Sequence, residues 1–439
     1  MAEVDITDLR KMAGGASREI WSFTLGLPGG VKRDLIVRRD PPSAEPGVME
    51  REAFLMRRAA GLGVPVPEIV ATSFDSAALG ASAIVMARVQ GNAEPQYVLT
   101  HPALDNVRGA LAFECGQILA RIHSIEVPPG DMPGYRDPLE YYRGVLDRIG
   151  ESRPAFELAM DWLHHNRPAA TAGGPAVLHG DFRLGNFLVS AEGIAAVLDW
   201  EMAKLGDPLE DLAWLCLEDW RFGGEKPVGG FGSLDDFFAG YEAAGGRPLE
   251  RGALRWWNVL STLKWGVICL EQADLHISGK EKSIELAVLG RRACELEWQL
   301  LHLLYGSPPS QMQMSDDLSE SMIHGRASAG VLADAVRSTV RDLTAVTSPK
   351  QQLELKIAAR IVGMILRQAQ FEPAQMELEK RLREPIGAAE SEDVHRLIRS
   401  GLWREAEDQI KLYAWSTARM RLSVANPKFL FSWRPCEPL

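Results

Sequence analysis

The sequence lacks an apolar run long enough to cross a bilayer, which would take about 18 or more residues. Its N-terminal stretch, MAEVDITDLRKMAGG, is acidic and polar and does not resemble a secretory signal. The few cysteines form no C-x-x-C pair, which argues against a disulfide framework and against a zinc site. They are Cys115, Cys216, Cys269, Cys294 and Cys436. We therefore expect a cytoplasmic protein without membrane contact.

Positive charge is also in short supply. The chain has 48 lysines and arginines against 59 aspartates and glutamates, for a formal net charge of −11. Because nucleic-acid-binding proteins use basic patches to neutralise phosphates, we expect no nucleic-acid partner. The 439 residues are 46% apolar and 24% charged, which is typical of a soluble globular protein with room for two or three domains.

The pattern of apolar residues changes along the chain. Residues 1–92 are rich in strand signals, such as EIWSFTLGL and RDLIVRRD, and contain one helix pattern, GVMEREAFLMRRAAGLG. Residues 93–306 are mainly helical by periodicity, with short strands near their middle. Residues 307–316 have the composition of a linker, and residues 317–439 have the pattern of a separate helical unit. We predict domains with these limits.

Polar residues stand at the ends of short apolar stretches in AVLHGDFRLGNFLVS and IAAVLDW. His179 and Asp181 follow the first stretch, Asn186 comes five residues after Asp181, and Asp199 ends the third apolar run. This is the spacing of the catalytic loop and metal aspartate of protein kinases. Phosphoryl transfer needs a carboxylate beside the attacking hydroxyl and oxygen ligands for Mg²⁺. Asp181 suits the first task, and Asn186 and Asp199 suit the second.

Other polar residues around these three have structural or open roles. We predict that His179 holds the loop by hydrogen bonds rather than moving protons. Arg183 stands where a cation would stabilise charge on the transferred phosphoryl group, although an exposed loop arginine is an equal alternative. Asp207 is a good helix N-cap, and Asp211 favours the positive end of the same helix. We predict structural support for both aspartates.

The segment LHGDFRLGNFLV…VLDWEMAKLGDPLEDLAW resembles the aminoglycoside phosphotransferase and choline kinase superfamily of small-molecule kinases. The resemblance covers about residues 8–306 and is strongest to the kinase-like domains associated with acyl-CoA dehydrogenases. It implies an α+β, protein-kinase-like bilobal fold with ATP, Mg²⁺ and a small-molecule hydroxyl acceptor. It also implies that Asp181 is the catalytic base and that Asn186 and Asp199 bind the metal. A C-terminal helical bundle is appended to this fold.

The same resemblance extends to the N-terminal part. It assigns the phosphate-covering loop to Gly14, Gly15, Ala16 and Ser17. Arg38 stands where the phosphate-binding lysine is usual, and Glu52 is its helix partner. The backbone near Met86 to Arg88 is expected to contact adenine.

The sequence therefore predicts a kinase that moves the γ-phosphoryl group of ATP to a hydroxyl of a small molecule. A hydroxyacyl-CoA and an amino-alcohol or aminoglycoside are the two acceptor classes considered. The alternative is a nucleotide-binding pseudokinase that acts as an interaction module through its C-terminal helices. The choice between ATP and GTP and the oligomeric state stay open.

Overall fold

The computed structural model describes most of the chain. The described residues are 5–12, 18–41, 46–74, 79–128, 130–151, 153–281, 283–312, 336, 337, 340, 343 and 349–434. They form two compact units: the first unit comprises residues up to 136 together with 169–258, and the second comprises residues 137–168 together with those from 259 onward. The units differ in their limits from the domains predicted at 92, 306 and 316, which stay predictions.

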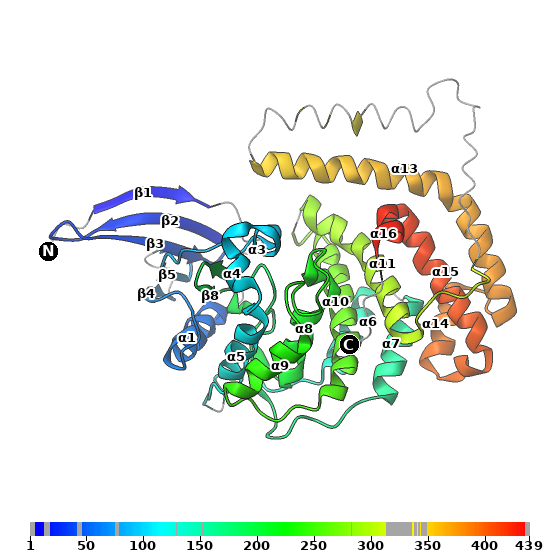
Figure 1. Ribbon diagram of the computed structural model, residues 1–439. Helices are drawn as coiled ribbons and strands as arrows, with labels where there is room; N and C mark the ends of the chain where they lie inside the picture. The colour runs from blue at the N-terminus through cyan, green and yellow to red at the C-terminus, as the bar shows by residue number, and fades with distance from the viewer. Residues whose placement is uncertain are drawn as a thin grey trace. The chain divides into compact units, whose positions relative to one another are not determined.

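An antiparallel sheet of five strands opens the first unit (Figure 1). Its strand order is β1(Asp5–Lys11), β2(Glu19–Gly26), β3(Lys32–Arg39), β5(Ala83–Ala87), β4(Ile69–Ser73). The strands predicted from EIWSFTLGL, RDLIVRRD and AIVMA are present as β2, β3 and β5. All side chains of strand β1 are exposed, so it has no buried face to produce an apolar alternation.

Helix α1(Val48–Gly61) covers this sheet with its apolar face. Met49 and Ala53 of α1 pack against Ile84 and Met86 of β5 in one buried cluster. The spacing of these two α1 residues places them one turn apart on the same side of the helix. Glu52 lies on this buried side as well, with 1% of its surface exposed.

The rest of the first unit is built around two helices in close contact. Helix α5(Leu111–His123) lies against α9(Leu234–Ala243), and glycines let their backbones approach. A Cβ on Gly116 would lie 2.1 Å from the Phe237 carbonyl oxygen, and one on Gly240 would lie 1.9 Å from that of Phe113. Larger side chains would force the two helices apart. The other helices here are α3(Pro95–Thr100), α4(Asp105–Arg108) and α8(Pro208–Cys216).

Two short strand pairs position the loops between them. Strand β6(Ala176–Leu178) pairs with β9(Lys204–Gly206), and β7(Phe187–Ser190) pairs with β8(Gly193–Val197), both antiparallel. The segment between β6 and β7 contains His179 to Asn186, and the segment between β8 and β9 contains Asp199. The four strands therefore fix the ends of both polar segments.

The second unit is helical. Within the described residues its helices are α6(Pro138–Ile149), α7(Pro154–His165), α11(Ile284–Tyr305), α13(Pro349–Arg383), α14(Ser391–Arg399), α15(Glu407–Ala425), α16(Pro427–Ser432) and most of α10(Leu254–Ile277). Leu158 of α7, Leu301 of α11 and Trp415 of α15 meet in one buried cluster. This core joins segments that are far apart in the sequence.

Two buried glutamates also join the helices of the second unit. Glu157 accepts hydrogen bonds from Arg143 at 2.9 and 2.8 Å and from Arg399 at 2.9 Å. Glu297 accepts one from Arg421 Nε at 2.9 Å and is also ion-paired with Arg153. Each carboxylate therefore has two arginine partners.

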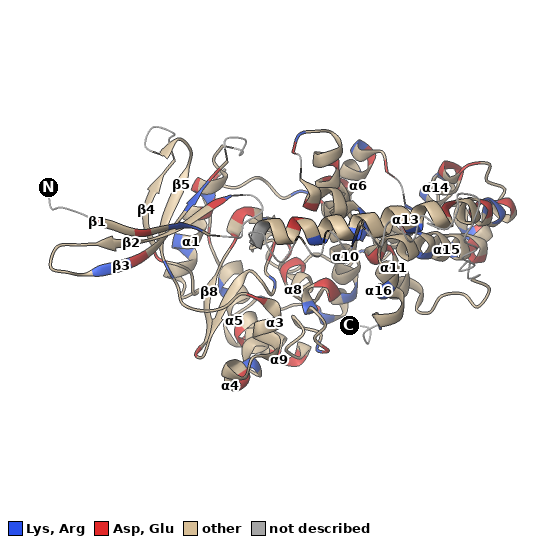
Figure 2. Cartoon of the chain, turned by 90° about the horizontal axis from the view of Figure 1, so that it is seen from above, with Lys and Arg blue, Asp and Glu red and all other residues tan. Residues whose placement is uncertain are grey.

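Charges of both signs are interspersed over each unit (Figure 2). None of the helices in the described part of the chain is both long enough and apolar enough to cross a membrane.

Candidate active site

The hairpin of β7 and β8 brings the predicted metal-binding residues to one place. Phe187 pairs with Val197, and the Leu198 N–H donates to the Asn186 carbonyl oxygen at 2.8 Å. Asn186 and Asp199 therefore lie at the same end of the hairpin. Asp199 has a left-handed backbone with φ 66°, a conformation that costs energy in a residue other than glycine and that is concentrated at functional sites.

The Asp181 carboxylate is held by three donors. Its Oδ1 accepts from Trp214 Nε1 at 2.7 Å and from Arg183 Nε at 3.0 Å. Its Oδ2 accepts from Asn186 Nδ2 at 2.5 Å. Since 14% of the Asp181 side chain is exposed, the carboxylate is oriented but still reachable.

Arg183 is more ordered than an exposed loop arginine would be. Besides its bond to Asp181, it donates to the Leu184 carbonyl oxygen at 3.3 Å. Its guanidinium lies over the Trp220 ring, 4.5 Å from the ring centre. A quarter of the side chain is exposed, at 25%. The charge is therefore fixed next to Asp181.

His179 is buried and both of its ring nitrogens are used. Nε2 donates to the Leu198 carbonyl oxygen at 2.9 Å, and Nδ1 accepts from the Asp181 N–H at 3.3 Å. Burial lowers the pKa of His179, more than the nearby Asp211 raises it, so the ring is neutral at pH 7. Its position fits the structural role that the sequence predicted.

Asp211 supports the same loop from helix α8. Its carboxylate accepts the backbone N–H groups of His179 at 2.7 Å and Gly180 at 2.9 Å. The His123 ring nitrogen lies 3.2 Å away and Tyr241 bonds the other side of that ring at 2.9 Å. Burial alone would raise the pKa of Asp211, but these bonds hold it below its ordinary value.

Asp207 caps α8, as predicted. Its Oδ1 accepts the Leu209 N–H at 3.0 Å, and the carboxylate also accepts the N–H and hydroxyl of Thr171 at 2.9 and 2.8 Å. These bonds satisfy a free helix N–H and fix the segment that precedes β6.

Arg38 bridges two carboxylates. Its Nη1 donates to Glu52 at 2.6 Å, and its Nη2 donates to Asp199 Oδ1 at 3.0 Å. The partnership of Arg38 with Glu52 was predicted from the sequence. The second bond uses the planar, two-pronged geometry of guanidinium, which lysine lacks.

Arg18 is a second cation on Glu52, and the sequence analysis missed it. Arg18 is ion-paired with Glu52, lies 2.9 Å from Asp40 and reaches Glu201 at 3.8 Å. Only 5% of its side chain is exposed. Its place directly after the predicted phosphate-covering loop was the available signal.

The predicted nucleotide contacts are described only in part. Gly14, Gly15, Ala16 and Ser17 lie outside the described residues. At the other end of the sheet, the N–H groups of Ala87 and Arg88 donate to the Glu68 and Asp34 carbonyl oxygens at 2.8 and 2.9 Å. Met86 is paired with strands on both sides. The N–H groups of Ala87 and Arg88 are therefore already hydrogen-bonded within the sheet. The first residues beyond these bonds are those that follow Arg88.

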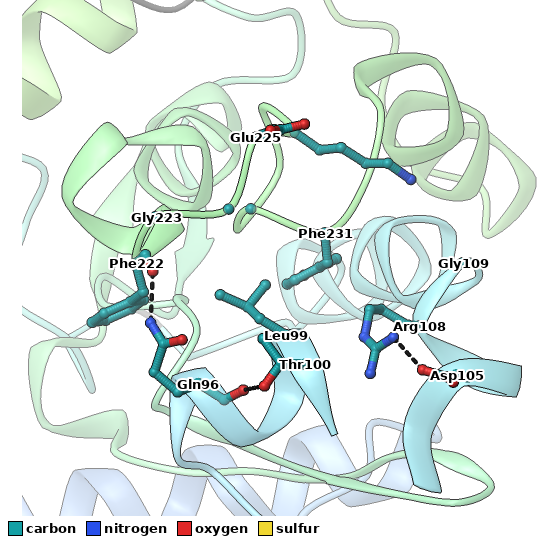
Figure 3. A pocket seen from close by; sticks show the side chains of 13 residues that line it. Gln96, Leu99, Thr100, Asp105, Arg108, Gly109, Phe222, Gly223, Glu225 and Phe231 are labelled. Carbon is teal, nitrogen blue, oxygen red and sulfur yellow. Dashed lines mark hydrogen bonds and ion pairs between the residues drawn. The ribbon is translucent and has the colours of Figure 1, made fainter. Parts of the chain in front are cut away.

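A cavity of about 470 Å³ lies in the same unit (Figure 3). Helices α3 and α4 line one side, and the glycine-rich loop at 222–231 lines the other. Gln96 joins the two sides by donating to the Phe222 carbonyl oxygen at 2.8 Å. Phe222 has a left-handed backbone with φ 48°, and its ring contacts Trp220 at 6.3 Å between ring centres. The wall of the cavity is therefore in contact with the residue that supports Arg183.

Trp214 and Trp220 were also missed. Trp214 comes three residues after Asp211 on α8, so the two share a helix face. Because Asp211 was predicted to support the catalytic loop, that spacing was a usable signal for Trp214. Trp220 had no comparable signal.

Comparison with known proteins finds relatives among acyl-CoA dehydrogenase proteins. The chain is 31% identical over 204 residues to acyl-CoA dehydrogenase family member 10 of Mus musculus, covering 42% of this chain and 18% of the relative. It is 28% identical over 356 residues to the probable acyl-CoA dehydrogenase IBR3 of Arabidopsis thaliana, covering 71% of this chain and 42% of that protein. The chain thus spans less than half of the length of either relative.

A solved structure supports the fold. A candidate aminoglycoside phosphotransferase from Ralstonia eutropha aligns with a TM-score of 0.53 and 24% identity, covering 68% of this chain and 91% of that structure. The predicted kinase-like α+β fold with further C-terminal helices is confirmed. The sequence also matches the phosphotransferase enzyme family over residues 8–257, more than half of the chain. The chain therefore belongs to the phosphotransferase enzyme family, which confirms the predicted class of small-molecule kinase.

Proposed function

We propose that this protein transfers the γ-phosphoryl group of ATP to a hydroxyl group of a small molecule. The observation that carries the proposal is the oriented Asp181 carboxylate, which is hydrogen-bonded on both oxygens and still partly exposed. In this function Asp181 accepts the proton of the attacking hydroxyl. Arg183 stabilises the charge of the transferred group.

The donor atoms at the hairpin suit Mg²⁺. Asn186 uses its amide nitrogen to bond Asp181, so its amide oxygen is the atom that can meet a cation. Asp199 binds Arg38 through Oδ1, and 41% of its side chain is exposed. Magnesium prefers oxygen ligands and commonly takes one or two carboxylates together with substrate phosphates. When bound, it neutralises phosphate charge.

Arg38 and Glu52 act on the nucleotide side of the site. Glu52 fixes the orientation of Arg38, whose guanidinium supplies the charge that lysine supplies in related kinases. The predicted adenine contact moves slightly along the chain. The N–H groups of Ala87 and Arg88 are used by the sheet, so we assign the backbone N–H contact to residues 89–91.

We assign the acceptor to the cavity beside α3, because its wall contacts Trp220 and, through it, Arg183. The curated relatives are named acyl-CoA dehydrogenases, which favours a hydroxyacyl-CoA as the acceptor. An amino-alcohol or aminoglycoside is the competing class.

One observation favours the alternative of a nucleotide-binding pseudokinase. Arg38 already bonds Asp199, an oxygen donor that the metal needs. If that bond persists with nucleotide present, the chain binds nucleotide without turnover and acts as an interaction module.

The test is a thermal-shift titration with Mg-ATP, repeated on Asp199→Ala and followed by a panel of acceptors. The panel contains hydroxyacyl-CoAs and aminoglycosides. We expect Mg-ATP to stabilise the wild-type protein, Asp199→Ala to lose that shift, and one class of acceptor to be phosphorylated. Stabilisation without turnover across the panel supports the pseudokinase, and no stabilisation at millimolar Mg-ATP contradicts both functions.

A further inference from the structure

Two side chains of helix α8 hold the loop that contains Asp181, one by bonding the backbone of the loop and one by bonding a side chain of the loop. Asp211 accepts the N–H groups of His179 and Gly180, and Trp214, three residues later, donates its indole N–H to Asp181. The indole is 1% exposed, so water cannot replace this donor without opening the core. A hydrogen bond to a charged group in such a place is stronger than one at the surface.

The geometry limits how Asp181 can receive a proton. A carboxylate has about four lone-pair positions, and three are used by Trp214, Arg183 and Asn186. Two of these donors share Oδ1, so the remaining acceptor capacity is at Oδ2. The hydroxyl of an acceptor is therefore met by one oxygen in one orientation.

Trp220 performs the same task for Arg183. The guanidinium lies over its ring at 4.5 Å, and the ring is 6% exposed. The two indoles contact each other with ring centres 5.5 Å apart. A cation–π contact that is shielded from water is worth more than an exposed one. The two tryptophans thus form one aromatic support beneath the two charged side chains of the loop.

We propose that Trp214 and Trp220 are positioning residues, Trp214 for the Asp181 carboxylate and Trp220 for the Arg183 guanidinium. This role rests on the proposed phosphoryl transfer. In this role, two buried indoles affect the rate of phosphoryl transfer by orienting the Asp181 carboxylate and the Arg183 guanidinium.

The first test uses phenylalanine at position 214, because Trp214→Phe keeps an aromatic ring and removes the N–H. We expect kcat for phosphoryl transfer to fall by about 10- to 100-fold, as for the loss of a hydrogen bond to a charged group. We expect KM for Mg-ATP to stay within about twofold, because the nucleotide contacts are unchanged. At position 220, Trp220→Leu should lower kcat, and Trp220→Phe, which keeps an aromatic face, should restore most of it.

The matched control is Trp403→Phe in the second unit. Trp403 is also a buried indole, at 7% exposed, and it belongs to the other compact unit from Asp181 and Arg183. We expect wild-type kcat for this variant even if it melts at a lower temperature. A loss of kcat in Trp403→Phe equal to that in Trp214→Phe would show that destabilisation, rather than positioning, is the cause.

A spectroscopic measurement tests the bond without any acceptor. In protein labelled with ¹⁵N-tryptophan, the Trp214 indole cross-peak is identified by its absence in Trp214→Phe. We expect this peak to move upfield in Asp181→Ala. A Trp214 peak that does not move in Asp181→Ala overturns the positioning role of Trp214.

The outcomes separate this inference from the proposed function. A wild-type protein that gains no stability from Mg-ATP contradicts the proposed function whatever the variants do. A wild-type protein that transfers phosphate while Trp214→Phe keeps its kcat within twofold overturns the positioning role alone.

Discussion

Buried glutamates in both units are each paired with two arginines, but the further carboxylates that these arginines reach have different roles. In the second unit, the side chains of Glu157 and Glu297 are 1% and 0% exposed. Burial alone would raise the pKa of Glu157, but hydrogen bonds from Arg143 and Arg399 hold it below its ordinary value. Burial would likewise raise the pKa of Glu297, but Arg421 and Arg153 hold it below its ordinary value.

In the second unit Arg153 also pairs with the exposed Glu151, and in the first unit an arginine likewise continues from a buried glutamate to an exposed carboxylate. Glu52 is 1% exposed and also has two arginines, Arg18 and Arg38. Arg38 has a further bond to Asp199, of which 41% is exposed. In the second unit the exposed carboxylates that the arginines also reach are Glu151 and Asp147, and the pairing there stabilises helices. In the first unit the exposed carboxylate is Asp199, which we propose binds the metal, so the pairing there orients a reactive group.

The largest effect that tests this comparison is at the open site. Asp181→Asn removes the proton acceptor and keeps the size of the side chain. We expect phosphoryl transfer to fall by about 1,000-fold, within the range for loss of a general base. The measurement is kcat with the acceptor found by the panel, and the control is an unchanged thermal shift with Mg-ATP. Turnover within tenfold of wild type would remove Asp181 from its assigned role.

In the second unit, Glu297→Gln leaves the charges of Arg153 and Arg421 facing a neutral amide. We expect the free energy of unfolding of this unit to fall by about 3 kcal/mol, as when one partner of a buried ion pair is removed. Urea unfolding followed by circular dichroism measures it. The matched control is Glu407→Gln, because Glu407 is 48% exposed in its pair with Lys411, with an expected change below about 0.5 kcal/mol. Equal losses of unfolding free energy in the two variants would contradict the distinction between buried and exposed ion pairs.

Arg38→Lys tests the residue that links the buried Glu52 to the exposed Asp199. A lysine ammonium retains the charge but cannot bond Glu52 and Asp199 with two prongs. We expect kcat/KM for Mg-ATP to fall about tenfold, equivalent to about 1.4 kcal/mol. Steady-state kinetics measures it. Higher activity with lysine would mean that the bond between Arg38 and Asp199 restrains the site, which favours the pseudokinase.

The smallest expected effect is on how the stability of the second unit changes with acidification, through the buried carboxylate of Glu157. Its pKa is lowered in the folded state from an ordinary value of 4.5, so the unfolded chain takes up the proton first. Stability from this group is complete above that value and is lost as the pH falls through the lower folded pKa. We expect the urea midpoint of the second unit to fall less steeply with acidification in Glu157→Gln than in the wild type. Parallel curves would mean that Glu157 adds nothing to the pH dependence.

The catalytic loop was predictable because its residues follow one another within 21 positions, from His179 to Asp199, and the strands between them fix their geometry. Arg18 was missed because its partner Glu52 is 34 residues away, and its place directly after the predicted phosphate-covering loop was the one local signal for it. The first strand has no buried face, so its residue pattern does not reveal it, and only the family resemblance, which places the loop at 13–17 between two strands, implies it. The adenine contact near Met86 to Arg88 stays a prediction, since a strand pattern does not show that the Ala87 and Arg88 N–H groups bond neighbouring strands.

The division of the chain between the units has a consequence for synthesis on the ribosome. Glu157 of α7 and its partner Arg399 of α14 are 242 residues apart. At about 5–20 residues per second, Glu157 emerges roughly 12–50 s before that arginine exists. The loop with Asp181 and Asp199 is translated within this interval. We therefore expect the catalytic loop to be complete while helix α7, translated before it, still lacks one of its two arginine partners.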